Sequence, residues 1–103
     1  MRVDEVMVVA DRARFRGTIR FFRPDRAGGL AVVDIPGEAA AALGGLKQMR
    51  VRGALNGLDF TSNTMPAGGG ILALSLSRKL LAAAGLNVGD EAEVDIERIE
   101  SAT

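Results

Sequence analysis

VRGALNGLDFT, residues 51–61, predicts a β-hairpin more clearly than any other part of the chain. Apolar and polar residues alternate on both sides of Asn56-Gly57, a pattern typical of half-buried strands. Asn-Gly supplies the two positive φ angles of a type I′ turn, so we expect a two-residue loop. In this register Leu55 faces Leu58, and Gly53 faces Phe60, whose ring covers the bare glycine.

Outside the hairpin, the sequence predicts two short helices, each preceded by an apolar run and a glycine cluster. The first helix has Pro36 in its first turn and is ended by Gly44. The second helix is capped by Ser77 and ended by Gly85. The expected strands cover residues 14–23, 30–35, 48–55, 58–65, 71–76 and 91–98, and the expected helices cover residues 36–43 and 78–84.

These elements repeat at one constant offset. Adding 41 to the residue number carries Gly28-Gly29 onto Gly69-Gly70, Val33 onto Leu74 and Gly44 onto Gly85 without a gap. We interpret the chain as a tandem duplication of strand, glycine turn, strand, short helix and strand, over about 14–55 and 58–98. The halves should then superpose through a pseudo-twofold axis.

The predicted fold is all-β: a six-stranded barrel with two short helices, built from two internal repeats. A single domain over residues 12–103 follows an N-terminal extension, residues 1–11. We expect the first and last strands to pair and so to close the barrel. The predicted core consists of Phe15, Ile19, Phe21, Val33, Ile35, Leu43, Val51, Leu55, Phe60, Leu72, Leu74, Leu76, Leu81, Val94 and Ile96.

The composition excludes several function classes. The 103 residues carry 13 basic and 13 acidic side chains, with no Cys and no His. Thiol nucleophiles, Ser-His pairs and nearly all transition-metal sites are therefore absent from the sequence. We expect a protein that is not an enzyme and has no catalytic residue, cofactor or metal. The N-terminal apolar run, residues 6–10, is too short for a signal peptide or membrane span, so we expect a cytoplasmic location without membrane contact.

Two family resemblances accompany these patterns. Residues 70–81 and 84–94 resemble the repeating unit of AbrB/MazE-like swapped-hairpin proteins. The motifs at residues 51–53, Asn56-Gly57, Phe60, Pro66, 68–70 and Gly89-Asp90 resemble more closely the domain-of-unknown-function 1905 family. The resemblance implies a double-split, AbrB-like barrel in which one chain supplies both halves, and it implies no established activity. Residues before Arg12 lie outside the match.

Two features are candidate ligand-binding sites, and each has a second interpretation. The glycine-rich loop at Gly68 and Gly69, flanked by Thr61, Asn63 and Thr64, offers backbone N–H groups to an anion. A flexible crossover between strands explains the same loop, since the Lys-Ser/Thr of a phosphate-binding loop is missing. Arg78 and Lys79 begin the second predicted helix, where cations oppose its macrodipole and suit either an anionic contact or solvated surface.

Charge is divided between the two ends of the chain. Residues 12–26 carry six arginines, Arg26 among them, against Asp25 alone, whereas residues 90–100 carry six acids against Arg98. Hairpin symmetry combined with the 41-residue offset places Glu97 opposite Arg16 and Glu93 opposite Arg20. Arginines paired in this way are poor phosphate ligands.

We therefore expect a non-catalytic binding or interaction module. Its partner is an unknown protein or small molecule, and the chain is a monomer or weak homodimer. The alternative is a nucleic-acid-binding or transcription-regulatory module, by analogy with AbrB-like folds. Zero net charge and the lack of Trp and Tyr argue against this alternative.

Overall fold

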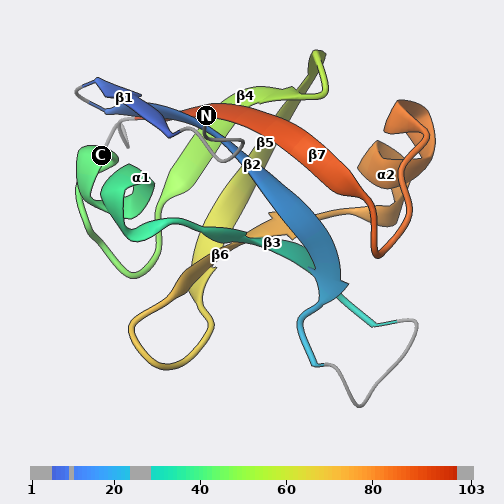
Figure 1. Ribbon diagram of the computed structural model, residues 1–103, viewed down its shortest axis with the longest axis horizontal. Helices are drawn as coiled ribbons and strands as arrows, with labels where there is room; N and C mark the ends of the chain where they lie inside the picture. The colour runs from blue at the N-terminus through green and yellow to red at the C-terminus, as the bar shows by residue number, and fades with distance from the viewer. Residues whose placement is uncertain (1–5, 10, 24–28, 100–103) are drawn as a thin grey trace, which may run out of the picture.

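A computed structural model describes residues 6–9, 11–23 and 29–99 of the chain (Figure 1). Two short helices interrupt a chain that is otherwise made of strands. Three residues named in the sequence analysis lie outside the described residues: Asp25, Arg26 and Gly28. The elements are β1 Met7–Val9, β2 Arg12–Phe21, β3 Ala31–Ile35, α1 Gly37–Ala42, β4 Arg50–Leu55, β5 Leu58–Pro66, β6 Leu72–Leu76, α2 Arg78–Ala84 and β7 Glu91–Arg98.

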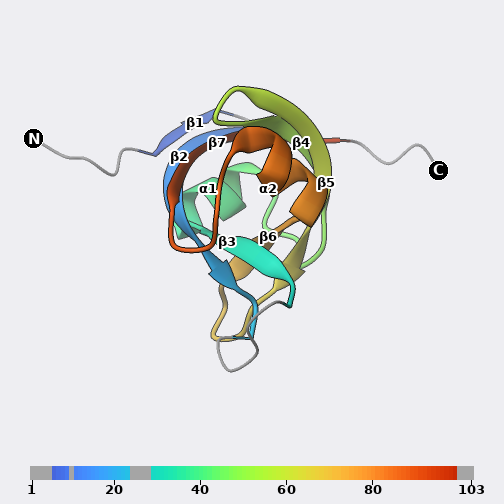
Figure 2. The ribbon, with the colours of Figure 1, turned by 90° about the vertical axis from the view of Figure 1, so that its right-hand side faces the viewer.

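The strands form one antiparallel sheet that closes on itself. Its order is β1-β2-β3-β6-β5-β4-β7, and a further pairing of β2 with β7 joins the last six into a barrel. Figure 2 looks along this barrel, with the strands as a ring and both helices projected inside it. In Figure 1 the helices lie at opposite ends of the barrel. The predicted six-stranded barrel with two short helices is confirmed.

The predicted hairpin is confirmed in both turn and register. Asn56 and Gly57 have φ angles of 49° and 85°, as a type I′ turn requires. Leu55 faces Leu58 and Gly53 faces Phe60. The Asn56 side-chain oxygen also accepts a hydrogen bond from the Glu93 backbone N–H, 2.7 Å away. The turn is thereby attached to the last strand.

Both helices end as their sequences predict. The Ser77 hydroxyl accepts a hydrogen bond from the Leu80 backbone N–H at 3.0 Å, which satisfies one free donor of the first turn of α2. Gly85 ends α2 in the left-handed conformation, with φ of 70°. Gly44 follows α1, and its N–H donates to the Ala41 carbonyl.

Within the described residues, no helix has the length and apolar character needed to cross a membrane.

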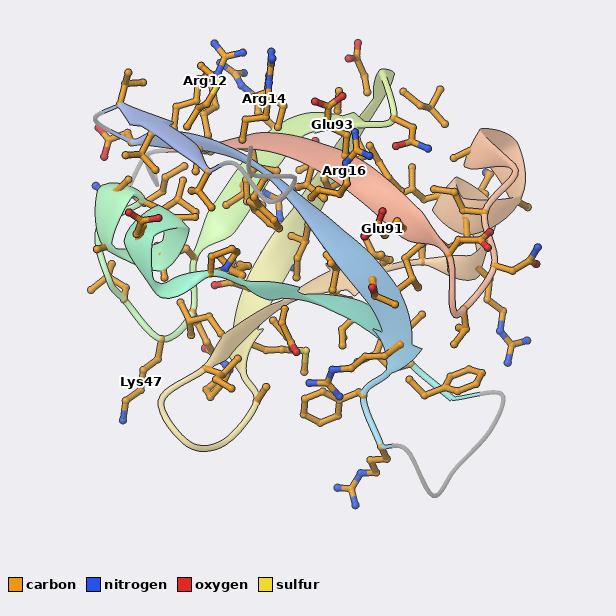
Figure 3. All side chains as sticks on the ribbon, in the orientation of Figure 1. Arg12, Arg14, Arg16, Lys47, Glu91 and Glu93 are labelled. Carbon is orange, nitrogen blue, oxygen red and sulfur yellow. The ribbon has the colours of Figure 1, made fainter. Side chains whose placement is uncertain are left out.

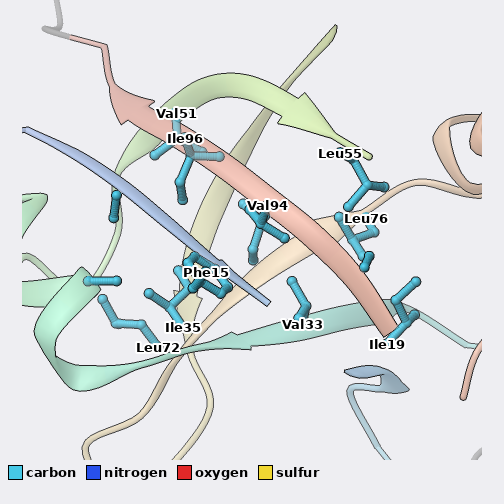
Figure 4. Close-up of a cluster of buried hydrophobic side chains, with 14 of the residues drawn as sticks. Phe15, Ile19, Val33, Ile35, Val51, Leu55, Leu72, Leu76, Val94 and Ile96 are labelled. Atoms are coloured by element: carbon cyan, nitrogen blue, oxygen red, sulfur yellow. The ribbon is translucent and has the colours of Figure 1, made fainter. Parts of the chain in front are cut away.

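The core fills the barrel with buried side chains from β2, β3, β4, β6 and β7, and the half-buried Phe60 of β5 packs against them (Figure 4). Of the predicted core residues, all but two are buried. Phe21 and Phe60 are only half-buried. Phe21 ends β2 and lines a groove beside α2, and Phe60 packs against the core from its rim. Buried residues that were not predicted to be in the core are Ala13, Ala31, Val32, Ala39, Met49, Thr64, Ala73 and Ala92.

The first and last strands pair as expected, but in a register four residues away from the predicted one. Phe15 faces Val94 and Arg16 faces Glu93, whereas the prediction placed Glu93 opposite Arg20. The segment between β2 and β3, residues 22–30, is four residues longer than its counterpart between β5 and β6, residues 67–71. The predicted register assumed a constant offset of 41 residues, which does not allow for this difference in loop length. Because the shift is even, each side chain stays on its predicted face.

One strand was not predicted. The sequence analysis placed residues 1–11 outside the barrel domain, yet β1 pairs with the start of β2 in the register Met7 to Arg14. All three of its residues are exposed. A strand this short carries too few alternating positions to be identified by periodicity.

Gly53 is required where β4 crosses β7. A Cβ added there would overlap the backbone carbonyl of Asp95, and backbone on a paired strand cannot move aside. We predict that Gly53→Ala lowers the free energy of unfolding by at least about 2 kcal/mol. Urea unfolding measures this loss.

Gly37→Ala is the matched control, because an added Cβ there meets nothing within 4 Å. Alanine is also the better helix former, so this variant should be as stable as the unmodified protein or slightly more stable. Equal stability of the two variants would contradict the close approach of β4 to β7.

Candidate functional site

Opposite charges face one another on the outer side of the barrel, across β2, β7 and β4 (Figure 3). Arg12 donates from Nε and Nη2 to the two carboxylate oxygens of Asp95, each at 3.0 Å. Arg14 Nη2 donates to Asp95 Oδ2 at 3.3 Å. On the other edge of β7, Arg52 Nε donates to Glu97 Oε2 at 2.8 Å. We call this surface the charged face: Arg12, Arg14, Arg16, Arg52, Glu91, Glu93, Asp95 and Glu97.

The partners within this network differ from those predicted. Arg16 was predicted to pair with Glu97, but its Nη1 lies 4.0 Å from Oε1 of Glu91. Arg20 is not part of the charged face. It pairs with Asp34 of β3, with 2.8 Å between Arg20 Nη2 and Asp34 Oδ1. The four-residue change in register causes both differences. The arginines of β2 are nevertheless paired with carboxylates, as the sequence analysis expected.

Asp95 is the centre of the network. The hydrogen bond from Arg12 lowers the pKa of Asp95 below its ordinary value of 3.8, and partial burial opposes this effect. The hydrogen bond from Arg14 and the charges of both guanidinium groups also favour the ionised carboxylate. The groups that contact the Asp95 carboxylate are the guanidinium groups of Arg12 and Arg14.

In the ranges that the structure describes, no three acidic side chains lie close enough together to hold a metal ion.

A first groove lies between the charged face and the β4–β5 hairpin. Its volume is about 550 Å³, and its walls include the Arg12–Asp95 and Arg52–Glu97 pairs. Thr61, one of the predicted ligand-binding residues, lines it. Both arginines in these walls are already paired with a carboxylate, so an anionic ligand would have to displace an existing ion pair. Asp59 adds a further acidic side chain to the lining.

A second groove, the Arg50 groove, has a volume of about 480 Å³. It contains one formal charge, that of Arg50, and no acidic side chain lines it. No ion pair joins Arg50 to any other described residue, in contrast to Arg52 two positions along the strand. Asn63 faces Arg50 directly across the β4–β5 pair. The lining residues are Leu30, Gln48, Met49, Arg50, Asn63, Thr64, Met65 and Ser75.

Thr64 contributes to this groove mainly by organising its wall. Its side chain is 2% exposed, and its Oγ1 accepts a hydrogen bond from the Met49 backbone N–H at 2.9 Å. The Thr64 N–H donates in turn to the Met49 carbonyl at 2.8 Å. These two bonds fix the chain that leads into β4 against β5. They set the position of Arg50 at the start of that strand.

The predicted ligand-binding residues do not form one site. Asn63 and Thr64 meet in the Arg50 groove, Thr61 lies in the first groove, and Arg78 lines a third groove beside α2. Gly68, Gly69 and Lys79 line none of these three grooves. Figure 3 places Lys47 well away from the charged face.

Sequence reasoning missed Arg50 and the apolar residues Leu30, Met49 and Met65 of the same groove. These residues come from separate segments of the chain, so no local motif joins them. One signal was present in the sequence: Arg50 lies within the predicted hairpin strand, and the hairpin register alone places it opposite Asn63. Applying that register two residues further would have brought this pair together.

Comparison with known proteins gives one family. The family model described as "Domain of unknown function (DUF1905)" matches residues 15–96, which include the whole barrel except the start of β2 and the end of β7. No curated protein matches the chain.

We predict that the Asp95 network makes stability depend on pH. Because the folded-state pKa of Asp95 is lowered, its contribution is present above pH 3.8 and is lost as the pH falls through the folded-state pKa. Asp95→Asn should therefore be less stable than the unmodified protein at pH 7, and the difference should be smaller at a pH well below 3.8, where Asp95 becomes protonated. Because the pairs are surface pairs, we expect a difference of about 1 kcal/mol.

Urea unfolding at both pH values measures this difference. Glu93→Gln is the matched control, since it removes one carboxylate from the same strand that makes no ion pair with a described residue. A stability difference between Asp95→Asn and the unmodified protein that is the same at pH 7 and at a pH well below 3.8 would contradict the role of Asp95.

Proposed function

The chain belongs to the DUF1905 family, a domain of unknown function, and we propose that its barrel is a non-catalytic binding module. The Arg50 groove is the proposed ligand site. The observation that carries the proposal is the presence, in one groove, of a cation and an amide on facing strands beside apolar walls. Known ligand sites combine apolar walls with a few convergent polar groups in about 300–1,000 Å³.

Nucleic-acid binding is the weaker alternative. It follows from the resemblance to AbrB-like proteins and would require arginines that are available to phosphates. Each arginine of β2 lies against a carboxylate: this holds for Arg12, Arg14, Arg16 and Arg20. A phosphate backbone would have to displace these carboxylates, which favours the binding-module proposal.

The proposal includes the finer fold assignment, a double-split barrel made of two internal repeats. Support comes from two strand pairs, β3–β6 and β4–β7. Val33 faces Leu74, and Ala54 faces Asp95, each pair separated by 41 residues. Where a twofold axis crosses an antiparallel pair, equivalent residues of the two repeats must face each other. Both pairs meet this condition.

The remaining pairings support the same assignment once the longer first loop is included. Ile19 faces Val33 in the first half, and Thr64 faces Leu74 in the second. These pairs correspond if β2 maps onto β5 with an offset of 45 residues and β3 onto β6 with an offset of 41. The difference of four equals the difference in loop length. The duplication therefore has one insertion, between β2 and β3.

Amide chemical-shift mapping tests the proposed function. We expect small fragments at millimolar concentration to shift the amide signals of residues 48–50, 63–65 and Ser75, because these residues surround the groove. Duplex DNA at about 150 mM salt should leave the spectrum unchanged. Absence of fragment-dependent shifts in the groove would contradict the proposal, and so would tight, salt-sensitive binding of DNA.

A further inference from the structure

The charge of the Arg50 groove selects for an anion. Arg50 is its single ionised lining residue, and it faces the exposed Asn63 across the sheet. The first groove has three acidic residues and two arginines in its walls, and both arginines are already paired with carboxylates, so this groove disfavours an anion. An anion entering the Arg50 groove meets no carboxylate among its lining residues.

The donors in this groove suit a carboxylate. A guanidinium group presents its N–H donors as a planar fork that matches the two oxygens of a carboxylate. The Asn63 amide can add a donor from the facing strand. Thr64 Oγ1, by contrast, is engaged by the Met49 backbone. Arg50 and Asn63 therefore supply a charged donor and an amide donor on facing strands, and Gln48 and Ser75 are the other polar residues of the lining.

The apolar walls define the rest of the ligand. Leu30 is exposed at 42%, and Met49 and Met65 line the same groove. Methionine side chains are flexible and polarisable, and their sulfur atoms make favourable contacts with aromatic rings. Two methionines and a leucine suit an aromatic or short aliphatic body. A volume of about 480 Å³ suits a small molecule.

We propose that the Arg50 groove binds a small molecule that carries one carboxylate on a short aromatic body. Arg50 binds the carboxylate, Asn63 donates to it, and Leu30 and Met65, the more accessible apolar side chains of the groove, contact the ring. This inference rests on the proposed function and makes it more specific, because it names the chemical class of the ligand.

Three probes of one shape test the ligand class: 4-phenylbutyrate, 4-phenylbutan-1-ol and 4-phenylbutylamine. Amide chemical shifts are followed in a titration of the full chain with each. We expect the carboxylate to shift the signals of residues 48–50 and 63–65 and to bind about tenfold more tightly than the alcohol, the gain expected from one charge-assisted hydrogen bond. The amine should bind more weakly than the alcohol.

Two variants on the same strand test the role of Arg50. Arg50→Gln should weaken binding of the carboxylate about tenfold and remove its advantage over the alcohol. Arg52→Gln is the matched control: it removes one arginine that pairs with Glu97 outside this groove, and it should leave binding unchanged. The dispersed amide spectrum of each variant verifies that the barrel is folded.

The outcomes separate the inference from the proposed function. If carboxylate and alcohol bind the groove equally well, or if Arg50→Gln has no effect, the ligand class is wrong and the groove remains a binding site. If none of the probes shifts the groove signals, both the ligand class and the proposed site are wrong.

Discussion

The pairing of β7 with both β2 and β4 is the constraint on which the rest of the structure depends. It joins the two ends of the sheet, so that each strand of the ring has two neighbours. The closed ring encloses the core, and at position 53 the backbone of β4 lies so close to the Asp95 carbonyl of β7 that only glycine fits. The bond from Glu93 to Asn56 adds a contact between the hairpin turn and β7.

The same closure determines the chemistry of the surface. It brings the basic strand β2 beside the acidic strand β7, so that charges separated by about eighty residues of chain neutralise one another. Exposed ion pairs contribute little stability individually, and their main effect here is to occupy the arginines. Arg50 lies at the start of β4, outside this network. The difference between Arg50 and Arg52 follows from their positions relative to β7.

Local patterns predicted the elements well because each depends on nearby residues: Asn56-Gly57 made the turn, and Ser77 and Gly85 bounded α2. The β2–β7 register depended on the length of the loop between β2 and β3, which the constant offset did not include, so the predicted register was wrong by four residues. Val32 was missed as buried because the continuous apolar run of β3 conceals which face is inside. The Arg50 groove could not be identified, since tertiary structure alone brings its segments together.

Contacts between Hα protons across β2 and β7 test the closure most directly. Backbone hydrogen bonds join Ile19 to Asp90 and Gly89, so the outward-facing pairs are the closely spaced ones without hydrogen bonds. Nuclear Overhauser effects between these protons are therefore expected for Arg16 with Glu93 and for Arg14 with Asp95. Effects joining Arg20 to Glu93 instead, or none between these strands, would contradict the closed barrel in this register.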